Sequence, residues 1–153
     1  MNSLFKALVL GLCLLLSGMV HAQGLRNNVK LQERLTQAKL GEIQRNLAIP
    51  QEKMNALAPI YRRYDAEVNA IHFARQDLLQ AGRLANLSNE EADKVVAALL
   101  ENAVKLSTVR KNYYAEFKTV LTPQQVMAMY RSEAQMRRRV QQELRRRMLN
   151  KTK

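Results

Sequence analysis

The residue types that most often carry enzyme chemistry are scarce in this sequence. Its two histidines are His21 and His72, and its single cysteine is Cys13. His21 and Cys13 lie in an N-terminal segment that has the features of a removable leader, so His72 is the one imidazole expected in the finished protein. One imidazole cannot supply the several ligands of a metal site, and it lacks the partner needed for a usual nucleophile–base pair. We therefore predict no catalytic residue, no cofactor and no metal site.

The carboxylates and glycines favour the same conclusion. Asp65 and Glu67 form one acidic cluster, and Glu90, Glu91 and Asp93 form another. Carboxylates at helix starts and on polar faces are usually solvated, or they complement the positive end of the helix dipole. The glycines occur singly, so no glycine-rich loop is present that could cradle a phosphate. The sequence predicts a protein that is not an enzyme.

The N-terminal segment has the pattern of a secretory signal peptide. A basic start precedes an apolar run over residues 7–20, which is short for a membrane span. Val20 and Ala22 occupy the −3 and −1 positions if cleavage falls before Gln23. We therefore predict an exported protein that is cleaved before about Gln23 and keeps no stable membrane span afterwards. An uncleaved N-terminal anchor is the alternative.

The remaining residues, 23–153, have the length of one domain and a strong positive charge. The whole chain has a net charge of +12, and residues 131–153 hold nine Lys/Arg and two Glu. Two arginine triplets, 137–139 and 145–147, contribute most of this excess. Such a surface is either a solvated basic helix face or a binding surface for acidic protein segments or lipid headgroups. Nucleic acid fits poorly, because the protein is predicted to be exported and no aromatic residues alternate with the arginines.

Apolar residues recur at spacings of three and four along most of residues 23–153, and no segment alternates as a strand would. The pattern predicts an all-α fold with four amphipathic helices, over about 28–46, 50–81, 88–120 and 123–150. Pro59 lies inside the second helix and is expected to kink it.

Local signals mark several helix ends. Gly82 is a natural C-terminal cap for the second helix. Ser88 and Glu91 have the spacing of a capping box at the start of the third. The apolar stripe predicted for the third helix consists of Ala92, Val95, Val96, Leu99, Ala103, Leu106, Tyr113, Phe117 and Val120.

The stretch "LTPQQ" sits between the third and fourth helices. Thr122 can cap a helix through its hydroxyl, Pro123 suits the first helical position, and Gln125 can reach back to the Thr122 N–H. We expect Leu121, Thr122, Pro123 and Gln125 to have a structural role, as a sharp stop and restart of the chain.

Leu121 to Gln125 also matches the LTxxQ motif of the Spy/CpxP family of periplasmic helical proteins. The segment over residues 49–68 resembles the first copy of that motif and its helix in Bacteroidota members, although Ile49, Pro50 and Lys53 depart from it. The resemblance covers nearly all of residues 23–153. It implies a bent helical-hairpin protomer of four helices that forms an antiparallel homodimer shaped as a curved cradle.

The function that this resemblance implies is that of a periplasmic, ATP-independent chaperone acting in envelope stress, whose partners are unfolded or partly folded proteins. We expect clients to be attracted by exposed arginines and held weakly by apolar side chains. The expected client-binding residues are Arg62, Arg63, Arg137, Arg138, Arg145, Arg146, Tyr61, Met127, Met129 and Met136.

Two other functions stay open. The chain can be a dedicated periplasmic sensor or regulatory subunit that binds a membrane stress sensor or an anti-sigma factor of an extracytoplasmic-function sigma system. It can also be a basic binder of the envelope surface with no client activity.

Overall fold

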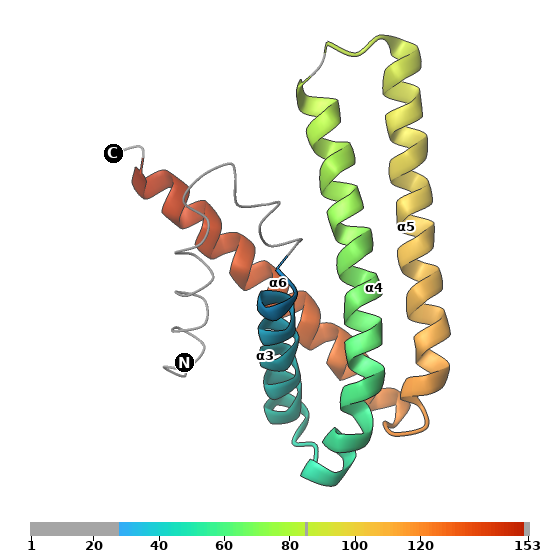
Figure 1. Ribbon diagram of the computed structural model, residues 1–153, viewed down its shortest axis with the longest axis vertical. Helices are drawn as coiled ribbons and strands as arrows, with labels where there is room; N and C mark the ends of the chain where they lie inside the picture. Colours follow the sequence, from blue (N-terminus) through green and yellow to red (C-terminus); the bar gives the residue numbers. More distant parts are fainter. Residues whose placement is uncertain (1–27, 85, 152–153) are drawn as a thin grey trace. The chain divides into compact units, whose positions relative to one another are not determined.

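The computed structural model describes residues 28–84 and 86–151, and every regular element in these ranges is an α-helix (Figure 1). The elements are α3 (Val29–Leu47), α4 (Gln51–Leu84), α5 (Asn89–Phe117) and α6 (Pro123–Lys151). The predicted all-α class and the four predicted helices are therefore confirmed. The signal peptide predicted over residues 1–22 lies outside the described residues.

The ends of α3 follow from local chemistry. The Asn28 side chain caps the helix by accepting a hydrogen bond from the Leu31 backbone N–H at 3.0 Å. At the other end Ala48 adopts the left-handed conformation, with φ of 48°, and turns the chain away from the helix. The Ile49 N–H then donates to the Gln44 carbonyl at 3.1 Å, which satisfies one of the terminal acceptors.

The capping box predicted at the start of α5 is confirmed. The Glu91 N–H donates to Ser88 Oγ at 3.3 Å, and the Ser88 N–H donates to Glu91 Oε2 at 2.8 Å. The hydrogen bond from the Ser88 backbone is also the main reason that the pKa of Glu91 lies below its ordinary value.

The prediction that Gly82 ends α4 is wrong, because the helix continues to Leu84. Gly82 lies on the side of α4 that faces α5, since a Cβ added there would lie 3.6 Å from Val95 Cγ1. Packing against α5 keeps residues 82–84 helical where local propensity favoured an end. The helix also runs through Pro59.

The chain divides into two compact units, and the first is the antiparallel hairpin of α4 and α5, joined by residues 85–88 (Figure 1). Four rings form a cluster near the end of the hairpin away from this loop. Tyr64 is its centre, with ring centroids 5.2 Å from Phe117, 5.5 Å from Tyr113 and 5.8 Å from Tyr61. Several of these contacts are tilted or edge-on, which are the favourable arrangements for aromatic pairs. Tyr61, Tyr64 and Phe117 are fully buried.

The second unit pairs α3 with α6, although these helices are far apart in the sequence. The two helices run antiparallel, because Asn46 lies beside Ser132 whereas Glu42, one turn earlier, lies beside Arg139. Asn46 Nδ2 donates to Ser132 Oγ at 2.8 Å, and Arg139 Nη1 donates to Glu42 Oε1 at 3.3 Å. The buried apolar side chains of this unit include Leu40, Ile43, Ile49, Val126, Met129 and Met136.

Candidate functional site

A cationic ribbon along α6 is the strongest candidate for a binding surface. Met127, Arg131 and Arg138 are exposed, and their spacings of four and seven residues place them on one side of the helix. Met127 is 51% exposed, and its sulfur lies 3.7 Å from an Arg131 nitrogen. No carboxylate among the described side chains forms an ion pair with Arg131 or Arg138. We call Met127, Arg131 and Arg138 the α6 ribbon.

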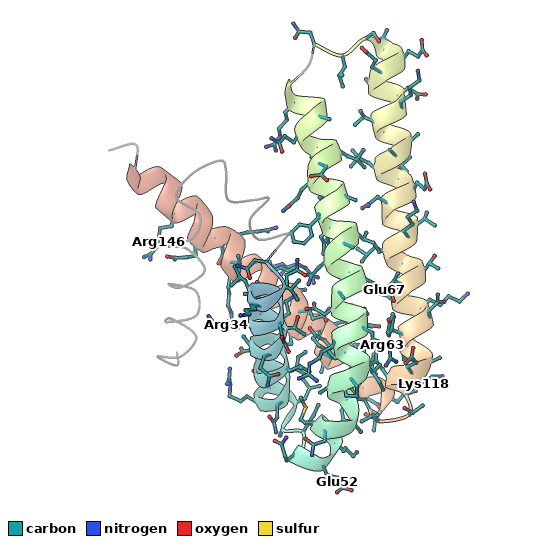
Figure 2. The ribbon with its side chains drawn as sticks, viewed as in Figure 1. Arg34, Glu52, Arg63, Glu67, Lys118 and Arg146 are labelled. Atoms are coloured by element: carbon teal, nitrogen blue, oxygen red, sulfur yellow. The ribbon has the colours of Figure 1, made fainter. Side chains whose placement is uncertain are left out.

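Other arginines of α6 form ion pairs with glutamates, so they contribute to stability as well as to the surface charge. Arg139 meets the buried carboxylate of Glu42, and Arg146 lies 3.0 Å from Glu143. Figure 2 shows Arg146 extending from α6. Arg137 lies 3.9 Å from Glu133, whose side chain is buried.

The two units differ sharply in charge. Residues 28–50 and 123–151 hold 12 Lys/Arg and four Asp/Glu, a net of +8. Residues 51–122 hold 10 Lys/Arg and nine Asp/Glu, a net of +1. Within the described ranges, the excess positive charge is therefore concentrated in the α3–α6 unit.

The arginines expected to bind clients are divided between the units. Arg62 and Arg63 lie on α4 and are exposed, and Arg63 forms an ion pair with Glu116 of α5. Arg137, Arg138 and Arg146 lie on α6, with Arg138 and Arg146 exposed and Arg137 partly buried. The side chain of Arg145 lies outside the described residues.

The structure corrects three of the four apolar contact residues. Tyr61 and Met129 are 0% exposed and Met136 is 8% exposed, so these side chains belong to the protein's core. Their periodic spacing in the sequence is compatible either with a core or with a binding surface. Their burial shows that they are core residues. Met127 alone among the four has an exposed side chain.

Glu42 is the electrostatic centre of the α3–α6 unit. Arg45 Nη2 donates to it at 2.6 Å, Asn46 Nδ2 at 3.4 Å, and Arg139 reaches it from α6. Burial acts to raise the pKa of Glu42, but the hydrogen bonds and positive charges outweigh it, and the pKa lies below its ordinary value. Glu42 is therefore ionised at neutral pH, and its carboxylate holds the positively charged side chains of Arg45 and Arg139 in place.

A second polar cluster stabilises the α4–α5 hairpin. Arg63 and Glu67, both labelled in Figure 2, face α5, where Arg63 pairs with Glu116 and the Tyr113 hydroxyl donates to Glu67 at 2.6 Å. Burial and the Glu67 carboxylate raise the pKa of Tyr113, and the charge on Arg63 offsets part of this shift. Arg63 therefore offsets one of the two carboxylate charges of this cluster, and the Tyr113 hydroxyl satisfies an oxygen of the other.

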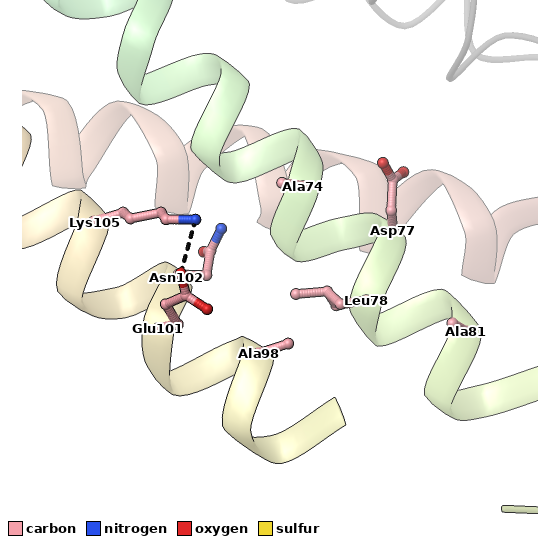
Figure 3. A pocket seen from close by; sticks show the side chains of 8 residues that line it. All are labelled: Ala74, Asp77, Leu78, Ala81, Ala98, Glu101, Asn102 and Lys105. Carbon is pink, nitrogen blue, oxygen red and sulfur yellow. Dashed lines mark ion pairs between the residues drawn. The ribbon is translucent and has the colours of Figure 1, made fainter. Parts of the chain in front are cut away.

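A shallow cleft of about 450 Å³ lies between α4 and α5 (Figure 3). Three of its lining residues are alanines, and its polar groups include Asp77, Asn102 and the Glu101–Lys105 ion pair. Asn102 is already used, because its Nδ2 donates to the Ile71 carbonyl at 3.1 Å. The cleft has no arrangement of groups typical of an active site.

An exposed apolar face on α5 was not anticipated from the sequence. Val96, Leu100 and Val104 are 53%, 64% and 64% exposed. Val96 belongs to the apolar stripe predicted for this helix, whereas Leu100 and Val104 lie outside that predicted stripe. Their spacing of four residues was a signal, but the apolar residues of α5 extend around so much of the helix that the sequence alone did not separate two faces.

Within residues 28–84 and 86–151, no three His, Cys, Asp or Glu side chains gather as a metal site would require. No helix in the same ranges is long and apolar enough to cross a bilayer.

No model of a known protein family, no curated protein and no solved structure matches this chain. The functional proposals below therefore depend on the residues and their arrangement.

Proposed function

We propose that this protein is a periplasmic, ATP-independent chaperone that binds unfolding proteins through the α6 ribbon. The observation that supports the proposal is the exposure of Arg131 and Arg138, without ion-pair partners among the described side chains, next to the exposed Met127. The leader-like segment and the LTxxQ resemblance favour the periplasm as the place of action and envelope stress as the setting.

The mechanism is non-covalent. The net charge of +8 on the α3–α6 unit attracts acidic segments of a client over a distance set by the ionic strength. Met127 then provides a flexible apolar contact that adapts to different side chains. Each contact is weak, so clients dissociate without nucleotide hydrolysis.

The first test is aggregation suppression. The purified protein is mixed with an unrelated unfolding client, without nucleotide, and light scattering is followed at low and at moderate salt. We expect suppression near stoichiometric amounts, and we expect it to weaken as salt screens the arginines.

A matched pair of variants tests which charges matter. Arg131→Gln with Arg138→Gln should weaken client binding about fivefold at low salt and have little effect at high salt. The control, Arg75→Gln with Arg83→Gln, removes the same charge from exposed positions on α4 and should change binding much less. Equal losses in the two double variants would contradict the assignment to the α6 ribbon.

Absence of suppression by a folded, helical protein would contradict the chaperone proposal. The function would then be that of a dedicated regulatory subunit, and its one partner would be sought among membrane sensors and anti-sigma factors.

A further inference from the structure

The α6 ribbon contains a sulfur atom that is open to reagents in solution. Met127 is 51% exposed, whereas Met54, Met129 and Met136 are 5%, 0% and 8% exposed. The thioether of methionine is a common target of oxidants, which convert it to a sulfoxide. Because an oxidant must touch the sulfur to react with it, Met127 is the described methionine that an oxidant reaches first.

The reaction with a peroxide transfers one oxygen atom. A lone pair of the sulfur attacks one oxygen of hydrogen peroxide, so that an S–O bond forms while the O–O bond breaks. The leaving hydroxide takes the proton of the transferred oxygen and becomes water. The sulfur is oxidised by two electrons and the peroxide is reduced by two. Two thiols reverse the step, since they form a disulfide as the sulfoxide oxygen leaves as water, and methionine sulfoxide reductases catalyse this reduction.

Arg131 gives the oxidation a consequence for the α6 ribbon. Its Nη2 atom lies 3.7 Å from the Met127 sulfur, one turn further along the helix. A thioether is a weak acceptor, so this contact leaves the guanidinium available to a client carboxylate. A sulfoxide oxygen is a strong acceptor, so Arg131 donates a charge-assisted hydrogen bond to it in the oxidised protein. Oxidation therefore makes Met127 polar and also gives Arg131 an acceptor on its own helix.

The change at Met127 is confined to the surface. Val126 and Met129 point into the core of the α3–α6 unit, whereas Met127 shares the exposed side of α6 with Gln124. A sulfoxide in the core would bury a polar oxygen and destabilise the fold. A sulfoxide at Met127 leaves that packing intact, so its effect falls on binding and not on stability.

We propose that Met127 is a reversible oxidation site, and that its sulfoxide weakens the binding of clients to the α6 ribbon. The first half of the inference depends on the exposure and chemistry of the sulfur alone. The second half rests on the proposed chaperone function. A peroxide thus lowers client affinity, and reduction by thiols restores it.

Peptide mapping tests the first half. The folded protein is treated with dilute hydrogen peroxide, and mass spectrometry of its peptides follows the oxygen gained by each methionine. Fragment ions separate Met127 from Met129. Met127 should react at least about tenfold faster than Met54 or Met129, because the folded core excludes the oxidant, and the difference should largely disappear in urea. The melting temperature of the singly oxidised protein should change by less than about 2 °C.

A binding measurement tests the second half. The probe is reduced, carboxymethylated α-lactalbumin, an acidic protein that stays unfolded without denaturant, and fluorescence anisotropy gives its dissociation constant. Oxidation at Met127 should raise this constant about fivefold, because an apolar contact becomes polar. The loss should persist at high salt, since salt does not screen an apolar contact. Treatment with methionine sulfoxide reductases should restore the original value.

Met127→Leu is the control for the other methionines. This variant keeps an apolar side chain at position 127 but has no sulfur there to oxidise. Its dissociation constant after peroxide is compared with its own value before peroxide, so its starting affinity does not enter. The constant should not change, because oxidation elsewhere in the chain leaves the α6 ribbon as it was.

A second pair of variants tests the part played by Arg131. In Arg131→Gln the effect of peroxide should fall to about twofold, because the sulfoxide then has no guanidinium to bind. Arg138→Gln removes the same charge from the same side of α6 but seven residues further along, and should keep the fivefold effect. Each variant is again compared with itself before and after oxidation.

Two results would overturn the proposal. One is oxidation of Met127 that is no faster than that of the buried methionines, and the other is an oxidised protein that binds the probe as tightly as before. An equal effect of peroxide on Met127→Leu would also contradict it. A reduced protein that does not bind the probe would contradict the chaperone proposal and the second half of this inference, while the peptide map still decides the first.

Discussion

The α4–α5 hairpin and the α3–α6 pair are both antiparallel helix pairs, but different interactions stabilise them. The hairpin has four clustered rings and a nearly balanced charge, with a net of +1 over residues 51–122. The α3–α6 unit joins its helices through aliphatic and methionine side chains and through Glu42 and Asn46, and it has a net charge of +8. The protein thus separates an aromatic, neutral unit from a unit whose stability and charge depend on the same arginines.

The two units also differ in their exposed side chains. The exposed arginines proposed to attract clients, which have no ion-pair partner among the described side chains, lie on the α3–α6 unit, whereas the exposed apolar residues Val96, Leu100 and Val104 lie on the hairpin.

The largest expected effect is on the aromatic cluster. Phe117→Ala should lower the free energy of unfolding by about 3–5 kcal/mol, because it removes a fully buried ring in contact with Tyr64 and Tyr113. Urea denaturation followed by circular dichroism measures the change. Ile43→Ala, at a fully buried position of the α3–α6 unit, is the comparison and should cost about 2–4 kcal/mol. A smaller loss for Phe117→Ala than for Ile43→Ala would show that the rings are not the main support of the hairpin.

The next effect concerns the charged contacts of the α3–α6 unit and depends on pH. Glu42→Gln should lower stability at neutral pH by about 1–2 kcal/mol, because it removes the charge that Arg45 and Arg139 bond. The folded pKa of Glu42 is depressed, so its contribution is complete above the ordinary pKa of 4.5. The contribution is lost as the pH falls through the folded pKa.

Denaturation of the native protein and of Glu42→Gln at several pH values checks this. The difference between the two should be constant near neutral pH and should shrink progressively below pH 4.5. A difference that does not change with pH would mean that the amide disturbs packing and that the charge contributes little.

The smallest effects are expected at the helix starts. Ser88→Ala should cost about 1 kcal/mol, because it removes the confirmed cap of α5. Thr122→Ala should cost a similar amount, about 1 kcal/mol, if Thr122 caps α6 as its sequence predicts. Melting temperatures of the two variants test both positions, and an unchanged value for Thr122→Ala would refute the predicted cap.

Much of the fold could be predicted because its signals are local. The starts of α3, α5 and α6 follow from Asn28, Ser88 and Pro123, whose side chains or fixed φ act within one helical turn. The end of α4 could not be predicted in the same way. Gly82 favours a helix end locally, but packing against Val95 of α5 extends α4 to Leu84. That contact depends on the other helix of the hairpin.

For the candidate surfaces too, some features follow from local sequence and others depend on tertiary contacts. The sequence by itself determined that the chain is helical, basic and poor in groups able to do chemistry, because composition and periodicity are properties of single segments. Tertiary structure decided that Tyr61, Met129 and Met136 are buried while Leu100 and Val104 are exposed. The tertiary structure also brings Arg139 next to Glu42, whereas Arg138 has no ion-pair partner among the described side chains. These outcomes depend on which helices meet, and an apolar or charged residue has the same local pattern on a covered face and on an open one.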